Sequence, residues 1–432
     1  MLYLKELCIE LQKTGNKITN LKTLLVIGHT FPEPSTTAAG SRMMQLLQLF
    51  QEDNYSITFA STATVSEKSE SFENLNIDRV SIQLNDSSFD ECIVKLNPTA
   101  VLFDRYITEE QFGWRVSKQC PNTLKILDTE DLHFLRKARE KAFKSKDGIE
   151  NADLYSETAK REIASIYRCD LTLIISEFEL NLLQNKFQIN KDILLYLPFL
   201  EEHISEEIIN SLPSFEERNG FMTLGNLLHA PNVDSVLYLK KEIWPFIRKQ
   251  LPNAILNIYG NYAPQQISAL HNEKEGFLIK GWAENLSKVM STSKVCLAPL
   301  RFGAGLKGKL LDAMKWGTPS ITTSIGAEGM HGDLNYSGIV SEDTESFARA
   351  AVQLYTSEEQ WEVTQKRGFQ IINQRFQKSI FKDAFLKRIS EIEENLKLHR
   401  NSNFMGQILQ HHTLKSTQYM SKWIEEKNKK SQ

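Results

Sequence analysis

The sequence has few cysteines, and none of them is close to another. The five, Cys8, Cys92, Cys120, Cys169 and Cys296, form no CxxC pair. Scattered cysteines of odd number do not form a disulfide framework or a zinc site, and they are typical of reduced thiols in a cytoplasmic protein. No other His/Cys cluster has the spacing of metal ligands.

The sequence also lacks long apolar runs and an excess of charge of one sign. No run approaches the ~18 residues of a membrane-spanning helix, and the first residues do not resemble a signal peptide. Lys plus Arg number 51 and Asp plus Glu number 54, for a net charge of −3, which argues against a nucleic-acid binder. We therefore expect a cytoplasmic protein, and the length of 432 residues allows two or three domains.

Short apolar runs alternate with helical patterns in the first half of the chain. Runs of this kind are typical of parallel strands that are buried on both faces. We predict strands at 23–28, 57–60, 100–103, 124–127 and 171–175. Strands that alternate with helices predict a doubly wound parallel sheet.

The alternation stops at 201–219, which is polar and rich in turn residues, and then restarts. We predict further strands at 220–224, 254–259, 277–280, 295–298 and 320–323. The expected fold class is α/β, with two Rossmann-like doubly wound domains facing a cleft, where ligands bind at the carboxyl ends of the strands. The expected divisions are a helical lead-in (1–21), a first domain (22–200), a linker (201–219), a second domain (220–385) and a helical, charged tail (386–432).

The segment 298–329 carries the most information. A strand ends at Ala298, and a loop with Gly303, Gly305 and Gly308 leads into a helix near Lys309. A glycine loop at a helix N-terminus offers free N–H groups and the positive end of the helix dipole to a phosphate. Lys307 adds a cation to this loop, and Asp312, one turn into the helix, can accept hydrogen bonds from ribose hydroxyls.

This segment resembles the family 4 glycosyltransferases, also called group 1 glycosyl transferases, which have the two-domain GT-B architecture and use nucleotide-sugar donors. The resemblance rests on Pro-Leu-Arg-x-Gly-x-Gly-x-Lys, an acidic residue followed by Ala-Met, and Gly-Ala-Glu-Gly at 326–329. Fragments at 225–232, 251–260, 281–282 and 169–179 agree with it. It covers roughly 22–385 and is strongest over 222–330.

One position departs from the family pattern. The family has two glutamates separated by seven residues around this helix; Asp312 takes the second place and Ala304 the first. The departure leaves open which residue contacts the transferred sugar, and it keeps a non-catalytic copy as an alternative.

The resemblance implies a set of donor-binding residues. Lys307 and Arg301 would hold the diphosphate, Asp312 the ribose, and Trp282 would lie in the base-binding turn. The full expected donor site is Gly40, Asn226, Gly260, Trp282, Arg301, Gly303, Gly305, Lys307, Asp312 and Glu328. For each residue an ordinary role as a turn or a solvated side chain is the alternative.

Acidic residues crowd the end of the strand at 124–127. We expect Asp128, Glu130, Asp131 and His133 to lie at the cleft edge, where one could orient or deprotonate an acceptor hydroxyl. Lys307 would act with them by stabilising charge on the leaving diphosphate. The alternative for the acids is a helix N-terminus, where carboxylates suit the dipole.

The expected function is transfer of a sugar from a nucleoside diphosphate sugar to an acceptor hydroxyl in glycan or polysaccharide biosynthesis. The resemblance implies a hexosyltransferase that retains the anomeric configuration and needs no metal; we expect no cofactor beyond the donor. Two alternatives are a nucleotide-sugar epimerase on the same fold and a non-catalytic nucleotide-sugar-binding scaffold. The acceptor would be a glycan or a lipid-linked sugar. The basic stretch 136–146 could contact the inner face of a membrane or be a solvated helix face.

Overall fold

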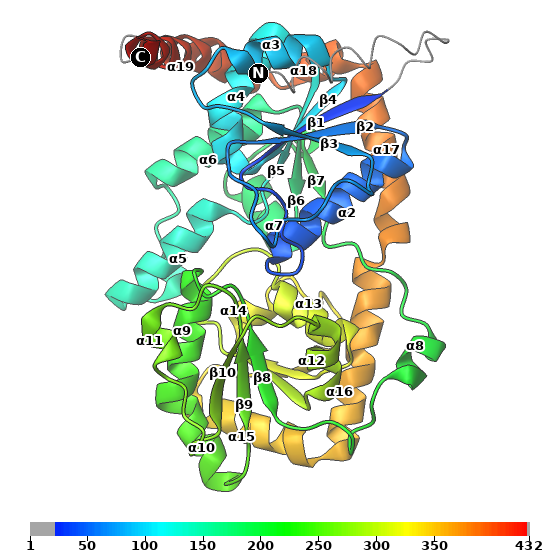
Figure 1. Cartoon of the computed structure of the whole chain (residues 1–432), viewed down its shortest axis with the longest axis vertical. Helices are drawn as coiled ribbons and strands as arrows, with labels where there is room; N and C mark the ends of the chain where they lie inside the picture. The colour runs from blue at the N-terminus through cyan, green and yellow to red at the C-terminus, as the bar shows by residue number, and fades with distance from the viewer. Residues whose placement is uncertain (1–21, 430–432) are drawn as a thin grey trace.

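The computed structural model describes residues 22–429 as two α/β domains stacked along the long axis of the molecule (Figure 1). The expected lead-in at 1–21 lies outside the described residues. Each domain contains one sheet, and all the strand pairs within the two sheets are parallel. The predicted fold class is therefore confirmed.

The first sheet has seven strands in the order β3-β2-β1-β4-β5-β6-β7. Its strands are β1 (Thr23–Gly28), β2 (Ser56–Ser61), β3 (Ile77–Ser81), β4 (Ala100–Asp104), β5 (Leu124–Asp128), β6 (Leu171–Ile174) and β7 (Leu194–Tyr196). The strand order reverses between β1 and β4, and at such a point the loops on either side diverge and open a crevice.

Helices cover both faces of this sheet. They are α2 (Ala38–Glu52), α3 (Ser88–Leu96), α4 (Arg105–Gln119), α5 (His133–Ser145), α6 (Glu157–Arg168) and α7 (Glu177–Asn185), with short turns η1 (Ile149–Asn151) and η2 (Lys191–Ile193). The hydroxyl of Thr37 caps α2 by accepting from the Gly40 amide at 2.9 Å. Apolar residues of α3 to α7 pack on one face of the sheet and those of α2 on the other.

The second sheet repeats this topology with six strands in the order β10-β9-β8-β11-β12-β13. Its strands are β8 (Phe221–Leu224), β9 (Leu256–Tyr259), β10 (Phe277–Gly281), β11 (Val295–Ala298), β12 (Ser320–Thr322) and β13 (Gly338–Val340). Its helices are α9 (Ala230–Tyr238), η3 (Leu239–Ile243), α10 (Trp244–Gln250), α11 (Gln265–Ser268), α12 (Leu286–Thr292), α13 (Gly308–Lys315), α14 (Ser324–Ala327), α15 (Thr344–Thr356), α16 (Glu358–Ile371) and η4 (Ile372–Phe376).

The chain crosses between the domains twice. The first crossing leads into α8 (Glu206–Ser211), within the expected linker. The second follows η4, and the two crossings lie side by side: the Glu201 amide donates to the Phe376 carbonyl at 2.7 Å, and the Lys378 amide donates to the Glu201 carbonyl at 2.8 Å.

The C-terminal part differs from the expected domain boundary at residue 385. Helix α17 (Lys378–Glu394) spans that boundary and packs on the first sheet through Phe385, Ile389 and Ile392. Their spacing predicts a helix with one apolar face, but spacing alone does not tell which of two similar sheets that face will cover. Two more helices, α18 (Leu396–Ser402) and α19 (Phe404–Lys429), follow on the first domain (Figure 1).

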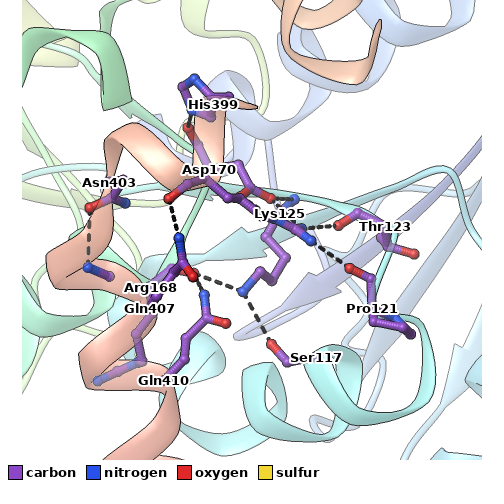
Figure 2. A network of polar contacts seen from close by, with 12 residues as sticks. Ser117, Pro121, Thr123, Lys125, Arg168, Asp170, His399, Asn403, Gln407 and Gln410 are labelled. Atoms are coloured by element: carbon purple, nitrogen blue, oxygen red, sulfur yellow. Dashed lines mark hydrogen bonds and ion pairs between the residues drawn. The ribbon is translucent and has the colours of Figure 1, made fainter. Parts of the chain in front are cut away.

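Polar contacts anchor α18 to the amino ends of β5 and β6 (Figure 2). The Arg400 guanidinium pairs with Asp170 at 2.7 and 2.8 Å and also donates to the Thr123 carbonyl at 2.8 Å. The buried Lys125 ammonium donates to the Arg168 carbonyl at 2.8 Å. These bonds satisfy charged groups that would otherwise be buried without partners.

Candidate functional site

A cavity of about 370 Å³ lies between the domains, and both domains contribute to its wall. The first domain provides the loop after β1 and the segment after β5; the second provides the loops after β8, β9, β10 and β11. All of these follow the carboxyl ends of parallel strands, where ligands of doubly wound sheets bind.

The glycine loop after β11 approaches the first domain closely. Gly305 has φ +64°, and a Cβ placed there would lie 2.8 Å from the Cβ of Asp131 in the first domain. A Cβ at Gly308 would lie 2.6 Å from the Cβ of Ala38. Glycine at these positions therefore allows the two domains to meet around the cavity.

Two lysines at the junction of this loop and α13 have different surroundings. Lys307 is buried, and its ammonium donates to the Gly305 carbonyl at 2.6 Å, within its own loop. Lys309, in the first turn of α13, donates to the Asn232 side chain at 2.7 Å. Both line the cavity. Sequence reasoning missed Lys309, although its place in the first turn of α13, beside a phosphate-binding loop, was a usable signal.

Asp312 lies one turn further along α13 and lines the cavity as expected. Burial, followed by the nearby Glu201 carboxylate, raises the pKa of Asp312 to about 7. A ligand hydroxyl that donates to this carboxylate would favour its ionised form. Asp312 is therefore suited to binding a polyhydroxylated ligand.

The acidic segment after β5 divides into buried and cavity-facing residues. Asp128 is fully buried, and the Arg42 guanidinium bonds to both of its oxygens at 2.8–3.1 Å. It does not line the cavity, whereas Glu130, Asp131 and His133 do. Asp128 therefore stabilises the first domain from within and is not in a position to contact a ligand.

The cavity-facing acids differ in their ionisation. Burial, followed by the neighbouring Asp128, raises the pKa of Glu130 well above its ordinary value. Burial acts in the same direction on Asp131, but the Arg136 guanidinium, 2.6 Å from its carboxylate, outweighs it and lowers the pKa of Asp131. The pKa values of these two cavity-facing carboxyl groups are thus shifted in opposite directions.

His133 has an unusual environment for a cavity residue. Its Nδ1 is buried, has no hydrogen-bond partner among the described residues and lies 3.5 Å from the Glu162 carboxylate. The Glu162 oxygens accept from the backbone amides of His133 and Phe134 at 3.1 and 2.9 Å, which caps α5 and fixes the place of His133.

Glu179, on α7, joins the two halves of the site. Its Oε1 accepts from the Leu132 amide of the first domain at 3.0 Å and from the Gly305 amide of the second at 2.8 Å. Burial, followed by the Asp131 charge, raises the pKa of Glu179 to about 8. Sequence reasoning missed this residue, because both of its partners are backbone amides far away in the chain.

The far side of the cavity is lined by Asn226, Gly260 and Trp282. A Cβ at Gly260 would lie 2.2 Å from the Gly225 carbonyl, so the loops after β8 and β9 can approach only with glycine at this position. The Trp282 indole donates to the Ser35 carbonyl of the first domain at 3.2 Å, and the Lys68 ammonium lies 3.2 Å from its ring centroid.

Three of the expected donor residues have partners of their own outside the cavity. Arg301 pairs with Asp234 at 2.6 Å, and Gly40 is placed against the backbone of Glu33. Glu328 pairs with Arg139 of α5 at 2.7 Å, across the domain boundary. Arg139 also donates to the Gly303 carbonyl at 2.9 Å. Glu328 therefore acts in the contact between the domains.

Arg105 and Arg136 also line the cavity, beside the acids. Arg105 has a left-handed backbone, with φ +70°, and pairs with Asp104 at 3.1 Å. Sequence reasoning noted Arg136 only as part of a basic helix. Within the described part of the chain, no group of three or more His, Cys, Asp or Glu residues could hold a metal ion, and none of the helices has the length and apolar character to cross a membrane.

Comparisons with known proteins agree with this geometry. Residues 218–357, most of the second domain, match the family model of glycosyl transferases group 1. A curated Klebsiella pneumoniae protein, described as an uncharacterized 44.6 kDa protein in the cps region, is 26% identical over 133 residues, which are 29% of this chain and 34% of that protein. The chain thus matches only about a third of that relative.

Solved structures show the same two-domain fold. Sucrose-phosphate synthase from Thermosynechococcus elongatus superposes with a TM-score of 0.66 and 13% identity, over 86% of this chain and 99% of that one. Anabaena HepE in complex with UDP and glucose superposes with a TM-score of 0.62 and 10% identity, over 86% of this chain and 100% of that one. WaaG, a glycosyltransferase involved in lipopolysaccharide biosynthesis, superposes with a TM-score of 0.56 and 13% identity, over 84% of this chain and 98% of that one. The chain therefore has the GT-B fold, and most of its second domain matches the family model of glycosyl transferases group 1.

Proposed function

We propose that this protein is a glycosyltransferase that moves a sugar from a nucleoside diphosphate sugar to an acceptor hydroxyl in glycan biosynthesis. The observation that carries the proposal is the composition of the cavity. Lys309 and the N-terminus of α13 line one cavity together with the carboxylate of Asp312, further along the same helix, and that of Asp131, from the first domain. Cations suit a diphosphate, and carboxylates suit the hydroxyls of ribose and sugar.

The donor would lie along the second domain. Its base would contact the Trp282 and Gly260 side of the cavity, its ribose would donate to Asp312, and its diphosphate would lie at the start of α13. When the bond between the anomeric carbon and the diphosphate oxygen breaks, negative charge grows on the diphosphate. Lys309 and the amides of the glycine loop stabilise that charge, which lowers the barrier.

The acceptor would enter from the first domain. Asp131, kept ionised by Arg136, orients the acceptor hydroxyl as its oxygen bonds to the anomeric carbon, and the hydroxyl proton passes to a phosphate oxygen of the leaving diphosphate. Burial raises the pKa of Glu130, which favours the protonated form that can donate to a sugar oxygen. We propose retention of configuration and no metal requirement, with the cations of the cavity in the role that a metal would take.

UDP is named as a ligand of HepE, and we propose a uridine or related nucleotide as the donor base here. WaaG is named as an enzyme of lipopolysaccharide biosynthesis, and a glycan or a lipid-linked sugar suits the cleft. The described cysteines, Cys92, Cys120, Cys169 and Cys296, are free thiols, which agrees with a place in the cytoplasm.

A nucleotide-binding scaffold without catalysis is the second candidate. It is favoured by Ala304, which lines the cavity where the family pattern has a carboxylate. Asp131 and His133 reach the same space from the first domain and could replace the missing group.

The test combines binding and turnover. A thermal-shift panel of UDP, GDP, ADP and CMP identifies the base. Release of that nucleotide from the matching nucleotide sugars, measured with and without acceptor, then reports turnover. Transfer or slow donor hydrolysis supports the proposal. Formation of an epimer would assign an epimerase instead, and binding without turnover would assign the scaffold.

The lysine that faces the ligand provides a matched pair of variants. We expect Lys309→Ala to weaken nucleotide binding at least tenfold, which corresponds to about 1.4 kcal/mol. Lys249→Ala, at an exposed position of α10, removes the same charge away from the cavity and should leave binding unchanged. Equal binding by both variants would contradict the placement of the diphosphate.

A further inference from the structure

The last helix of the chain has an inverted distribution of polar and apolar residues. Helix α19 contacts α4 and α6 of the first domain. Most of the side chains on its inner side are polar: Gln410 donates to the Arg168 carbonyl at 2.8 Å, and Ser421 accepts from Arg115 at 3.1 Å. The side-chain amide of Gln407 also donates to the Arg400 carbonyl at 2.7 Å.

The outer side of α19 carries a group of large apolar residues, with charged residues such as Lys422 among them. Six large apolar residues there are 38–70% exposed: Phe404, Met405, Ile408, Tyr419, Met420 and Trp423. We refer to them as the outer face of α19. At 100° per residue these positions fall on one side of the helix, opposite Gln410 and Ser421. A surface helix normally turns its apolar side inward, so exposed residues of this kind in such number indicate a contact surface.

The outer face is divided into two clusters with the same spacing. Phe404, Met405 and Ile408 lie at the start of the helix, and Tyr419, Met420 and Trp423 lie near its end. Each cluster has the pattern i, i+1, i+4. Phe404 and Trp423 lie at equal distances along the chain from the midpoint between positions 413 and 414, one on each side. Ile408 and Tyr419 form a second such pair.

We propose that the outer face of α19 binds α19 of a second copy of this chain, antiparallel and across a two-fold axis at that midpoint. In this arrangement Phe404 lies opposite Trp423 of the other copy, and Ile408 lies opposite Tyr419. A two-fold interface needs a patch that is complementary to itself. Four of the six residues, Phe404, Ile408, Tyr419 and Trp423, form such pairs about this axis, whereas Met405 and Met420 lie opposite Lys422 and Gln407.

The size of the patch fits this partner. Large apolar and aromatic side chains that are exposed to this degree present on the order of 700 Å². A stable dimer buries about 800 Å² on each partner, and the two clusters together approach that area. Aromatic residues and methionine are also the types enriched in such interfaces.

The position of α19 leaves the cavity free. The helix lies at the outer end of the first domain, away from the second domain (Figure 1). Pairing through it would place two molecules end to end, with both clefts open to donor and acceptor. The dimer is therefore compatible with the proposed function and independent of it.

The first test is the mass of the full chain in solution, measured by light scattering after size exclusion and by sedimentation. We expect a dimer, twice the chain mass of 49.6 kDa. The double variant Tyr419→Glu with Trp423→Glu should be a monomer with an unchanged circular dichroism spectrum. Phe246→Glu, an exposed aromatic position on α10, is the matched control and should remain dimeric.

Crosslinking tests the register. Mixed Phe404→Cys and Trp423→Cys chains should form a disulfide-linked pair on oxidation. Phe404→Cys alone should not, because its two copies would lie about 28 Å apart, at 1.5 Å per residue over 19 positions. The unsubstituted chain reports any background from native cysteines.

Several outcomes would overturn the proposal. A monomer at tens of micromolar would do so, as would efficient crosslinking of Phe404→Cys with itself. A monomer whose outer face binds vesicles of phosphatidylglycerol, but not of phosphatidylcholine, would assign the surface to an anionic membrane instead.

Discussion

Asp128 and Arg42 form an ion pair with almost no solvent exposure, 0% and 1% for the two side chains. Removing one member of such a pair leaves the other charge buried and uncompensated, which costs about 3–5 kcal/mol. We expect Asp128→Ala to lower the free energy of unfolding by that amount in chemical denaturation. Glu130→Gln, in the same segment but facing the cavity, should change it far less. Similar losses in both variants would contradict the separation of structural from ligand-facing acids.

The pKa of Asp312 gives a prediction about pH. The ordinary pKa is 3.8 and the folded value is about 7, so the folded chain holds this proton to higher pH than the unfolded chain does. Ionisation is therefore more costly in the folded state, and the contribution of Asp312 to stability falls as pH rises from about 4 to about 7. Asp312→Asn removes that loss.

We expect the melting temperature of Asp312→Asn to exceed that of the unsubstituted chain by a margin that grows from pH 5 to pH 8. Nucleotide binding should weaken in the same variant at pH 8, because the amide is a poorer acceptor for ribose hydroxyls than the carboxylate. A melting difference independent of pH would show that the carboxyl titrates normally.

At the scale of elements, the glycine loop depends on conformations that only glycine adopts easily. Gly305→Ala would strain a backbone with φ +64° and place a Cβ against Asp131. The resulting shift would also displace the Gly305 amide, which donates a hydrogen bond to Glu179. We expect donor KM to rise at least fivefold with a small loss of stability. Gly220→Ala, with φ +72° outside the cavity, imposes comparable strain without the contact and should leave KM unchanged. Equal KM in both variants would show that only backbone strain matters.

The elements that the sequence predicts correctly are those with a strong local signal. The runs at 23–28 and 295–298 are apolar throughout because both faces of these central strands are buried, and they are found as β1 and β11. The edge strands β3, β7 and β13 were missed, since they have only five, three and three residues.

The same reasoning explains which site residues were found. Gly303, Lys307 and Asp312 lie within one short segment, so their spacing is visible in the sequence. The partners of Asp128 and Glu328 lie 86 and 189 residues away, respectively. Nothing local distinguishes these acids from residues that contact a ligand, and only the packing of the two domains shows their partners.

At the scale of the whole molecule, contacts across the domain boundary keep the cleft closed. Arg139 of the first domain bonds to Glu328 and to the Gly303 carbonyl of the second. Closure of a cleft around its substrates excludes water from the reaction. The ion pair between Arg139 and Glu328 is therefore expected to set the balance between open and closed forms.

Exchange of the two charges tests this role. Arg139→Glu and Glu328→Arg each place like charges together, and we expect a larger radius of gyration in small-angle scattering and weaker nucleotide binding. The double variant restores an ion pair, so it should return the radius toward that of the unsubstituted chain, with a coupling energy of about 0.5–3 kcal/mol. If Glu328 also contacts the donor, the double variant will close but will not regain binding. Identical scattering from all four proteins would show that other contacts hold the domains together.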